Sequence, residues 1–165
     1  MIMKTHKLCL KKDKEFTLLR GHPWAFAEAF KALPENIKTG DIAEVFSHKD
    51  VYIGSGYIDT DSKILVRMIP VNKEETIEKA IPRLVKQAVL LRKEFFSISE
   101  KTNAYRVING EGDGLPGLIA DYYNGAVSLQ IYSLGLQPYI DIVIKALRDS
   151  LQNVKWIYQR NEIRL

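Results

Sequence analysis

Residues 104–132 read AYRVINGEGDGLPGLIADYYNGAVSLQIY, and this stretch indicates how the C-terminal half of the chain folds. Its last part, residues 126–132, alternates apolar and polar side chains, as a strand with one buried face does. Asn124-Gly125, directly before it, is a strong signal for a tight hairpin turn. The glycine-rich run 110–117 indicates a longer turn between strands. We therefore expect antiparallel strands here.

Helical patterns flank this stretch. Upstream, residues 73–96 place apolar side chains on one helical stripe. Pro82 should kink this helix or delay its start. Downstream, Pro138 precedes a second stripe over residues 140–151, and residues 154–158 form a further apolar strand. This predicts a β-β-α-β order that lacks a partner strand at its edge. We therefore expect the chain to be a piece of a longer protein.

The first 70 residues predict a different module. Pro23 is expected to open a short helix that carries Phe26, Phe30 and Leu33. The expected strands are short and cover residues 8–10, 16–19, 41–46, 51–58 and 64–69. Several short strands with one small helix predict a compact, β-barrel-like module, so the whole chain is expected to be α+β.

The amino-acid composition excludes some classes of protein and permits others. The 165 residues are 46% hydrophobic and 27% charged, with 24 Lys+Arg against 20 Asp+Glu and a net charge of +4. This mild excess permits a polyanionic partner. The single cysteine, Cys9, excludes an intramolecular disulfide, and we interpret it as a small buried apolar residue. No apolar run approaches the roughly 18 residues of a membrane span, so we expect a cytoplasmic protein with no membrane partner.

Known catalytic and metal-binding patterns do not occur. The three histidines lack ligand spacing, and no P-loop or nucleophile elbow is present, so we assign no catalytic and no metal residue. Gly112 and Gly114 could begin a phosphate-binding turn, although Pro116 and a strand follow where a helix N-terminus is needed. A nucleotide or small-molecule binder that uses this turn stays an alternative. Glu111 and Asp113 could form an acid/base pair, but turn carboxylates more often cap backbone amides.

The segment RGHPWAF at residues 20–26 carries more information. It places Arg20, His22 and Trp24 on a short turn, where aromatic rings could stack on unpaired bases while the arginine meets a phosphate. Lys11 and Lys12 add positive charge nearby. On the residues alone, packing of the aromatic side chains in the core is favoured over RNA contact.

These motifs resemble those of a known family, the class I SAM-dependent large-subunit rRNA cytosine-C5 methyltransferases of the RlmI type. RGHPWAF is similar to the opening of that family's PUA domain. YRVINGEGDGLPGLIAD at residues 105–121 is similar to its central hairpin almost position for position, and IYQRNE at residues 157–162 is similar to a later strand. The resemblance therefore runs from about residue 20 to residue 162.

The resemblance implies a fold and a function. Members have a PUA domain, a central β-β-α-β-β domain and a Rossmann-like methyltransferase domain. The chain would hold a PUA-like β pseudo-barrel at 1–71, a linking helix at 72–100 and an incomplete β-β-α-β(-β) central domain at 101–165. The catalytic Rossmann-like domain would be absent. SAM would bind in the full-length parent and no cofactor in this chain, which alone would be inactive.

The implied role is recognition of ribosomal RNA for that absent catalytic domain. The RNA-binding candidates are Lys11, Lys12, Arg20, His22 and Trp24. A turn that faces RNA or the catalytic domain would contain Arg106, Asn109, Glu111 and Asp113. The exposed strand edge near Tyr158 would also allow a homodimer. The alternative function is a stand-alone PUA-type RNA-binding adaptor without enzymatic activity.

Overall fold

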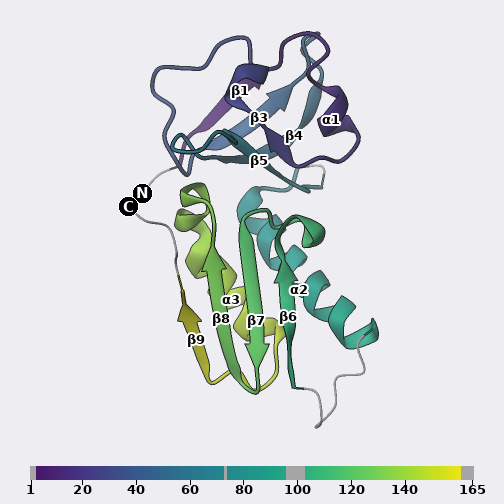
Figure 1. The fold of residues 1–165 in the computed structure, drawn as a ribbon. Coiled ribbons are helices and arrows are strands. Elements are labelled where there is room, and N and C mark those ends of the chain that lie inside the picture. The colour runs from purple at the N-terminus through teal and green to yellow at the C-terminus, as the bar shows by residue number, and fades with distance from the viewer. Residues whose placement is uncertain (1–2, 73, 96–102, 161–165) are drawn as a thin grey trace. The chain divides into compact units, whose positions relative to one another are not determined.

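A computed structural model describes residues 3–72, 74–95 and 103–160 of the chain. The chain forms two compact units (Figure 1). The first comprises Met1–Ile77 together with Ser133–Pro138, and the second comprises Glu78–Tyr132 and Tyr139–Leu165. The chain therefore leaves the first unit, returns to it for six residues, and leaves it again.

The first unit is built on a five-stranded sheet with the order β1-β3-β4-β5-β2. β1 runs parallel to β3, and the other neighbours are antiparallel. Just beyond β1, Leu10 bridges to Phe30, which follows β2 at the opposite edge. This bridge brings the two edges together and closes the sheet toward a barrel, as expected. The elements are β1 (Thr5–Cys9), α1 (Phe16–Leu19), β2 (Trp24–Ala25), the 3₁₀ turn η1 (Ala27–Ala29), β3 (Ile42–Phe46), β4 (Tyr52–Ile58) and β5 (Val66–Ile69).

Four of the strands expected here are confirmed, as β1 with the adjoining Leu10 bridge, β3, β4 and β5, and two expectations are wrong. Residues 16–19 form the helix α1 and no strand, because Leu18 is its one buried side chain and one helical turn satisfies that single contact. No α-helix opens at Pro23, and the helical geometry nearby is limited to the three residues of η1. Instead, Trp24 and Ala25 pair with Arg67 and Val66 of β5, and these ladder bonds replace helical ones.

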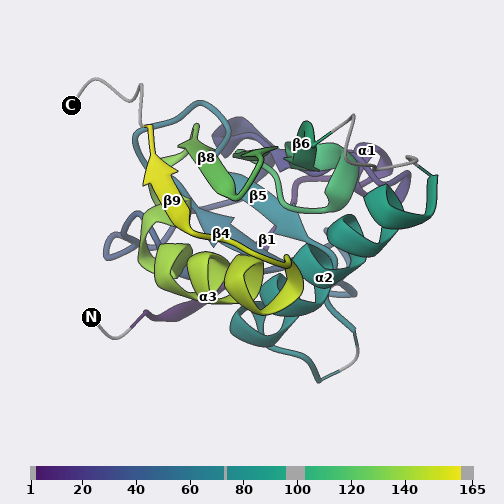
Figure 2. The same ribbon diagram turned by 90° about the horizontal axis from the view of Figure 1, so that it is seen from below.

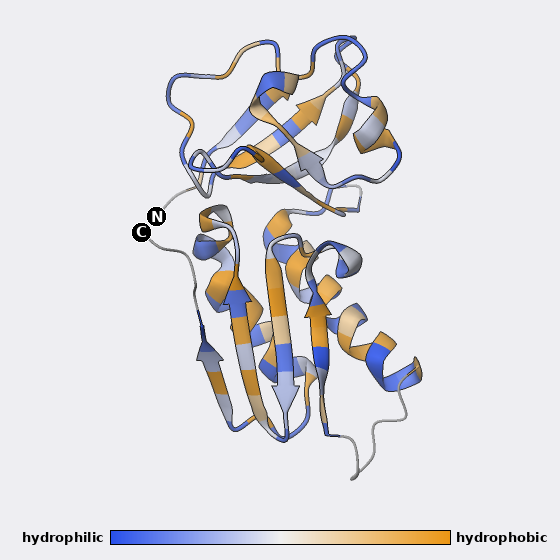
Figure 3. Ribbon diagram, viewed as in Figure 1, coloured by the Kyte–Doolittle hydropathy of each residue, from blue (hydrophilic) through white to orange (hydrophobic). Residues whose placement is uncertain are grey.

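The second unit is a four-stranded sheet, β6-β7-β8-β9, with both long helices on one face (Figures 1 and 2). Along β8 apolar residues alternate with polar ones (Figure 3). In β8 and in the first part of β7 every second residue is buried, and this buried set faces the helices. Its elements are α2 (Ile77–Phe95), β6 (Ala104–Asn109), the 3₁₀ turn η2 (Gly110–Asp113), β7 (Leu118–Tyr123), β8 (Ala126–Ile131), α3 (Ile140–Ser150) and β9 (Trp156–Gln159). A third 3₁₀ turn, η3 (Leu134–Tyr139), precedes α3.

The hairpin at Asn124-Gly125 is confirmed, with φ angles of 44° and 95° in the left-handed region. The β-β-α-β order misses one strand. The turn η2 divides residues 104–123 into the two strands β6 and β7, so three strands precede α3. After α3, β9 pairs with β8 in parallel. The helix expected as a linker groups almost entirely with the second unit, and Pro82 lies inside it without delaying its start beyond Ile77. The α+β class is confirmed, whereas the domain limits 1–71, 72–100 and 101–165 stay predictions.

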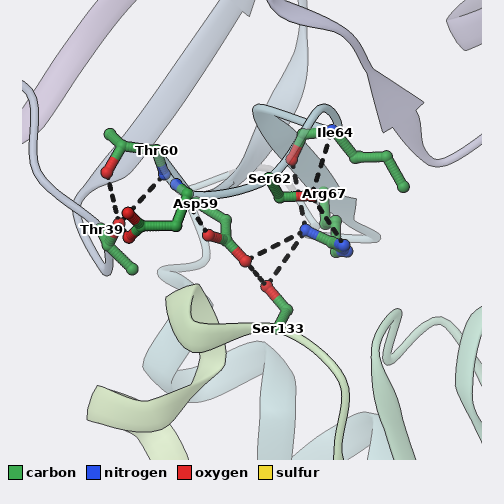
Figure 4. Close-up of polar contacts among 8 residues, drawn as sticks. Thr39, Asp59, Thr60, Ser62, Ile64, Arg67 and Ser133 are labelled. Carbon is green, nitrogen blue, oxygen red and sulfur yellow. Dashed lines mark hydrogen bonds and ion pairs between the residues drawn. The ribbon is translucent and has the colours of Figure 1, made fainter. Parts of the chain in front are cut away.

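The returning segment 133–138 packs closely against β4 of the first unit. A Cβ on Gly135 would lie 2.3 Å from the carbonyl oxygen of Ile58 and 2.6 Å from the ring of Tyr57, so only glycine fits. Beside it, Ser133 Oγ donates a 2.5 Å hydrogen bond to Asp59 Oδ2 (Figure 4). Arg67 Nη1 donates to Ser133 Oγ at 3.1 Å and lies 3.5 Å from the same carboxylate. This buried polar cluster fastens the segment to the unit.

Candidate nucleic-acid interface

The segment 20–26 lies at the surface of the first unit, between α1 and η1. α1 ends at Leu19, and Gly21 then takes a φ of +89°, which turns the chain away from the helix. The N–H of His22 donates back to the carbonyl of Thr17 at 3.0 Å. The carbonyl of Pro23 accepts the N–H of Met68 at 2.8 Å, next to the pairing of β2 with β5. Backbone bonds at both ends therefore fix the turn.

His22 and Trp24 contact each other on this turn. Their ring centroids lie 5.4 Å apart at an interplanar angle of 87°, an edge-to-face arrangement. The backbone N–H of Trp24 donates to His22 Nδ1 at 3.2 Å. With Nδ1 accepting, the neutral imidazole carries its proton on Nε2, which is then available as a donor. His22 is exposed and Trp24 is half-buried.

Two hollows border the turn, and His22 lines both. The first has a volume of about 270 Å³, and the second about 230 Å³. The first is lined by Leu10, Lys14, Thr17, Leu18, His22, Trp24, Ala25, Phe26, Glu28 and Ala29. The second is lined by Leu18, Gly21, His22, Pro23, Tyr52, Ile53, Gly54, Met68, Ile69, Pro70 and Val71. The imidazole therefore stands on a ridge between two largely apolar depressions.

Two lysines border the first hollow, beside Glu28, which also lines it. Lys14 lines it, and Lys11 Nζ donates to the carbonyl of Glu28 at its rim at 2.8 Å. Arg20 is exposed directly after α1, and Lys12 is exposed between β1 and α1. The structure therefore brings Lys11, His22 and Trp24 together around the first hollow, whereas Arg20 and Lys12 are exposed and line neither hollow.

Three exposed apolar side chains near this surface escaped the sequence analysis. Phe16 and Leu19 belong to α1, and Tyr52, at the start of β4, lines the second hollow. The strand predicted for residues 16–19 would have buried alternate side chains there. A run of apolar residues ending in Arg-Gly was the available signal for a short exposed helix.

The second set of candidates forms a closed turn. Arg106 pairs with Asp121 at 2.9 Å, and the hydrogen bond that its guanidinium donates to that carboxylate raises the pKa of Arg106. Asp113 accepts two hydrogen bonds from the guanidinium of Arg92 and one, at 2.6 Å, from the backbone N–H of Asn109. Since the Asp113 side chain is only 5% exposed, it holds the turn together. Arg92 was overlooked, although an arginine on the apolar stripe of α2 marks a buried partner.

The same turn offers little to a phosphate group. The N–H groups of Gly114 and Leu115 donate to the carbonyls of Glu111 and Gly110 within the turn. These amides are therefore occupied, and Glu111, which is exposed, adds negative charge. The nucleotide-binding alternative loses support from this geometry.

No group of three or more His, Cys, Asp or Glu side chains is placed to hold a metal ion within residues 3–72, 74–95 and 103–160. In the same ranges no helix combines the length and apolarity needed to cross a membrane.

Comparison with known proteins shows what the chain is similar to. Residues 8–70 match the model of a PUA-like domain. The chain is 33% identical over 158 residues to ribosomal RNA large subunit methyltransferase I of Alteromonas mediterranea, and 31% identical to the Pseudoalteromonas atlantica protein of that name. The chain matches the N-terminal part of this methyltransferase family. The resemblance stated from the motifs is thereby confirmed.

The matches also show how much of the family the chain represents. They cover 95% of the chain but only 39% and 40% of these two relatives. A Streptococcus mutans protein assigned as a SAM-dependent methyltransferase has a similar fold, with a TM-score of 0.80 at 24% identity over 94% of this chain and 40% of that one. These comparisons assign no role to individual residues, so all nine candidate residues stay predictions.

Proposed function

We propose that this chain is the RNA-recognition part of a SAM-dependent rRNA cytosine-C5 methyltransferase, and that it positions RNA for a catalytic domain elsewhere in the parent protein. The observation that carries the proposal is the ridge at His22, whose imidazole lines two hollows and contacts Trp24, with Lys11 at the rim of the first hollow and Arg20 exposed two residues before His22. This surface belongs to a PUA-like domain in a chain related to rRNA methyltransferases.

The chemistry of the ridge suits an unpaired nucleotide. A base can stack against an aromatic ring, which typically contributes about 1–3 kcal/mol per base. His22 Nε2 can donate to a base or ribose oxygen, while Arg20, Lys11 and Lys12 approach the phosphates. Since the net charge is only +4, few phosphates are neutralised, and binding should be weak and salt-dependent.

Methyl transfer is assigned to the parent protein. There, SAM would supply the methyl group for C5 of a cytosine whose C6 a cysteine thiolate attacks. The residues of this chain would hold the RNA backbone and orient the target. We therefore expect no methyl transfer from labelled SAM by the chain alone. A cytoplasmic location likewise stays a prediction.

The test is RNA binding measured by fluorescence anisotropy with a labelled rRNA hairpin at low and moderate salt. Arg20→Ala should weaken binding about fivefold at low salt and reduce the salt slope by about one, because one phosphate contact is lost. Lys63→Ala, which removes an exposed charge between β4 and β5, is the matched control. Equal affinity of the Arg20→Ala and Lys63→Ala proteins would reject this surface.

The stand-alone adaptor makes the same binding prediction. The two functions differ in the reading frame beyond residue 165. Continuation into a glycine-rich SAM loop supports the methyltransferase, and a stop codon supports the adaptor.

A further inference from the structure

The returning segment, Ser133–Pro138, belongs to the first unit, although the chain enters it after β8 and leaves it into α3. Both of these elements are part of the second unit. The match to the PUA-like domain covers residues 8–70 and does not include the segment. The first unit is therefore completed by residues that the chain supplies from the middle of the second unit.

One end of the segment provides the best hydrogen bond to a buried carboxylate. Asp59 is 3% exposed, and Ser133 Oγ donates to its Oδ2 atom at 2.5 Å (Figure 4). Arg67 Nη1 reaches the same oxygen only at 3.5 Å, the limit of a hydrogen bond. A buried carboxylate oxygen without a well-placed donor is costly, so the side chain of Ser133 stabilises this part of the first unit.

The rest of the segment approaches the first unit so closely that no methyl group fits between them. Gly135 lies against Ile58 and Tyr57 of β4, both of which are fully buried, and Leu136 beside it is fully buried as well. At the far end of the segment, a Cβ on Gly40 would lie 2.6 Å from Pro138 Cγ. Close approach at two points marks a specific packed contact, so the segment is an integral part of the first unit's core.

We infer that the returning segment makes the folding of the first unit depend on the second. The folded second unit holds β8 before the segment and α3 after it, so little further chain entropy is lost when the segment packs. When the second unit unfolds, the same residues lie in a long flexible loop, and ordering them costs more. The candidate surface is affected too, because Trp24 pairs in register with Arg67, to which Ser133 is hydrogen-bonded.

This dependence also reverses the usual order of folding. N-terminal domains generally fold first during synthesis. Here the first unit stays incomplete until residues 78–132 have been made and the segment after them has followed. The ridge at His22 therefore takes its final form together with the second unit and not before it.

Thermal unfolding of the full chain tests the packed contact. Trp24 emission in a Trp156→Phe background reports the first unit, because Trp24 pairs with Arg67 there. Gly135 has no left-handed φ, so Gly135→Ala adds only a steric block and should lower the Trp24 midpoint by about 8 °C or more. Gly112→Ala is the matched control, since its Cβ would find its nearest neighbour at an ordinary 3.6 Å.

Ser133→Ala is the milder variant, in case Gly135→Ala leaves the first unit unfolded from the start. It keeps the segment in place but leaves Asp59 Oδ2 with the 3.5 Å contact to Arg67, so the Trp24 midpoint should fall by about 4–8 °C. Ser62→Ala removes a longer, 3.4 Å contact to the same arginine and should have the smaller effect.

An insertion tests whether the second unit holds the segment. A flexible glycine-serine stretch between Tyr132 and Ser133 separates the segment from β8 and should lower the Trp24 midpoint by about 4 °C. The same stretch between Gln152 and Asn153, which are exposed after α3, is the control. Trp156 emission in a Trp24→Phe background verifies that the second unit of each insertion variant is folded.

Two results would overturn the inference. If Gly135→Ala and Ser133→Ala both unfold at the midpoints of their controls, the first unit does not need the segment. If these variants are destabilised but the insertion before Ser133 behaves as its control, the segment packs without linking the folding of the two units. Lower midpoints in both experiments support the inference. Neither experiment involves RNA, so the result is independent of the proposed function.

Discussion

Both units bury an arginine beside a carboxylate, but the two pairs differ in geometry. In the second unit, Arg92 of α2 grips Asp113 with two nitrogens, which joins the helix to the turn after β6. In the first unit, Arg67 of β5 contacts Asp59 only at 3.5 Å, and its remaining hydrogen bonds to Ile64, Ser62 and Ser133 measure 3.1–3.4 Å. Burial alone therefore does not set how much an ion pair contributes to stability. The alignment of the two groups and the number of other hydrogen-bond donors to the carboxylate set it.

The largest effect is expected from Arg92→Met. It leaves Asp113 buried with the hydrogen bond from the Asn109 amide but without its cation, so the second unit should lose about 3–5 kcal/mol of unfolding free energy. Urea denaturation, followed by Trp156 emission in a Trp24→Phe background, measures the loss. Lys86→Met removes an exposed charge from the same helix and should cost less than about 1 kcal/mol. Equal stabilities of these two variants would contradict the assignment.

A smaller loss is expected from Arg67→Met in the first unit. Asp59 keeps its hydrogen bond from Ser133 Oγ, and the bonds removed are long, so we expect about 2–3 kcal/mol. Trp24, directly opposite Arg67 in the sheet, reports this transition in a Trp156→Phe background. A loss as large as that of Arg92→Met would show that the stretched contacts matter as much as the aligned pair.

The smallest effect concerns Asp41, which accepts a 2.8 Å hydrogen bond from His6 in the first unit. Burial by itself would raise the pKa of Asp41, but hydrogen bonds from the Lys4 and Lys38 amides and from His6 outweigh it and lower this pKa below 3.8. A carboxyl group whose pKa is lower in the folded than in the unfolded chain stabilises the fold at pH values above the unfolded-state pKa. This contribution is lost as the pH falls through the folded value.

Unfolding free energies of the first unit, measured from neutral pH down to below 3.8, should therefore decline on the acid side. Asp41→Asn should be less stable at neutral pH and should show a flatter decline. An unchanged acid slope in the Asp41→Asn protein would exclude Asp41 as the source.

The second unit was the easier of the two to predict. Regular alternation in β8, the Asn124-Gly125 turn and the apolar stripe of α3 are local signals, and each produced the expected element. In the first unit, α1 and β2 span four and two residues, which is too short for any periodicity to be read. Their structure depends on contacts with strands far along the chain, such as the pairing of Trp24 with Arg67.

In the candidate surfaces, too, local sequence identified some residues, whereas contacts distant in the chain decided the position of others. Composition identified the segment from Arg20 to Trp24, because a cation, an imidazole and an indole so close together are unusual. It did not identify Tyr52, which joins the second hollow only through the fold. Asp113 was expected to face a partner, but the structure turns it inward to Arg92, twenty-one residues earlier.

By itself the amino-acid sequence determined the α+β class and most strands of the second unit, because periodicity and turn chemistry act between near neighbours. Tertiary structure alone decided that residues 133–138 return to the first unit and that Asp59, Arg67 and Ser133 meet there. It also decided that Tyr123, Trp156 and Tyr158 share one uncovered face. These arrangements join residues distant in sequence, and only the folded backbone sets which of them become neighbours.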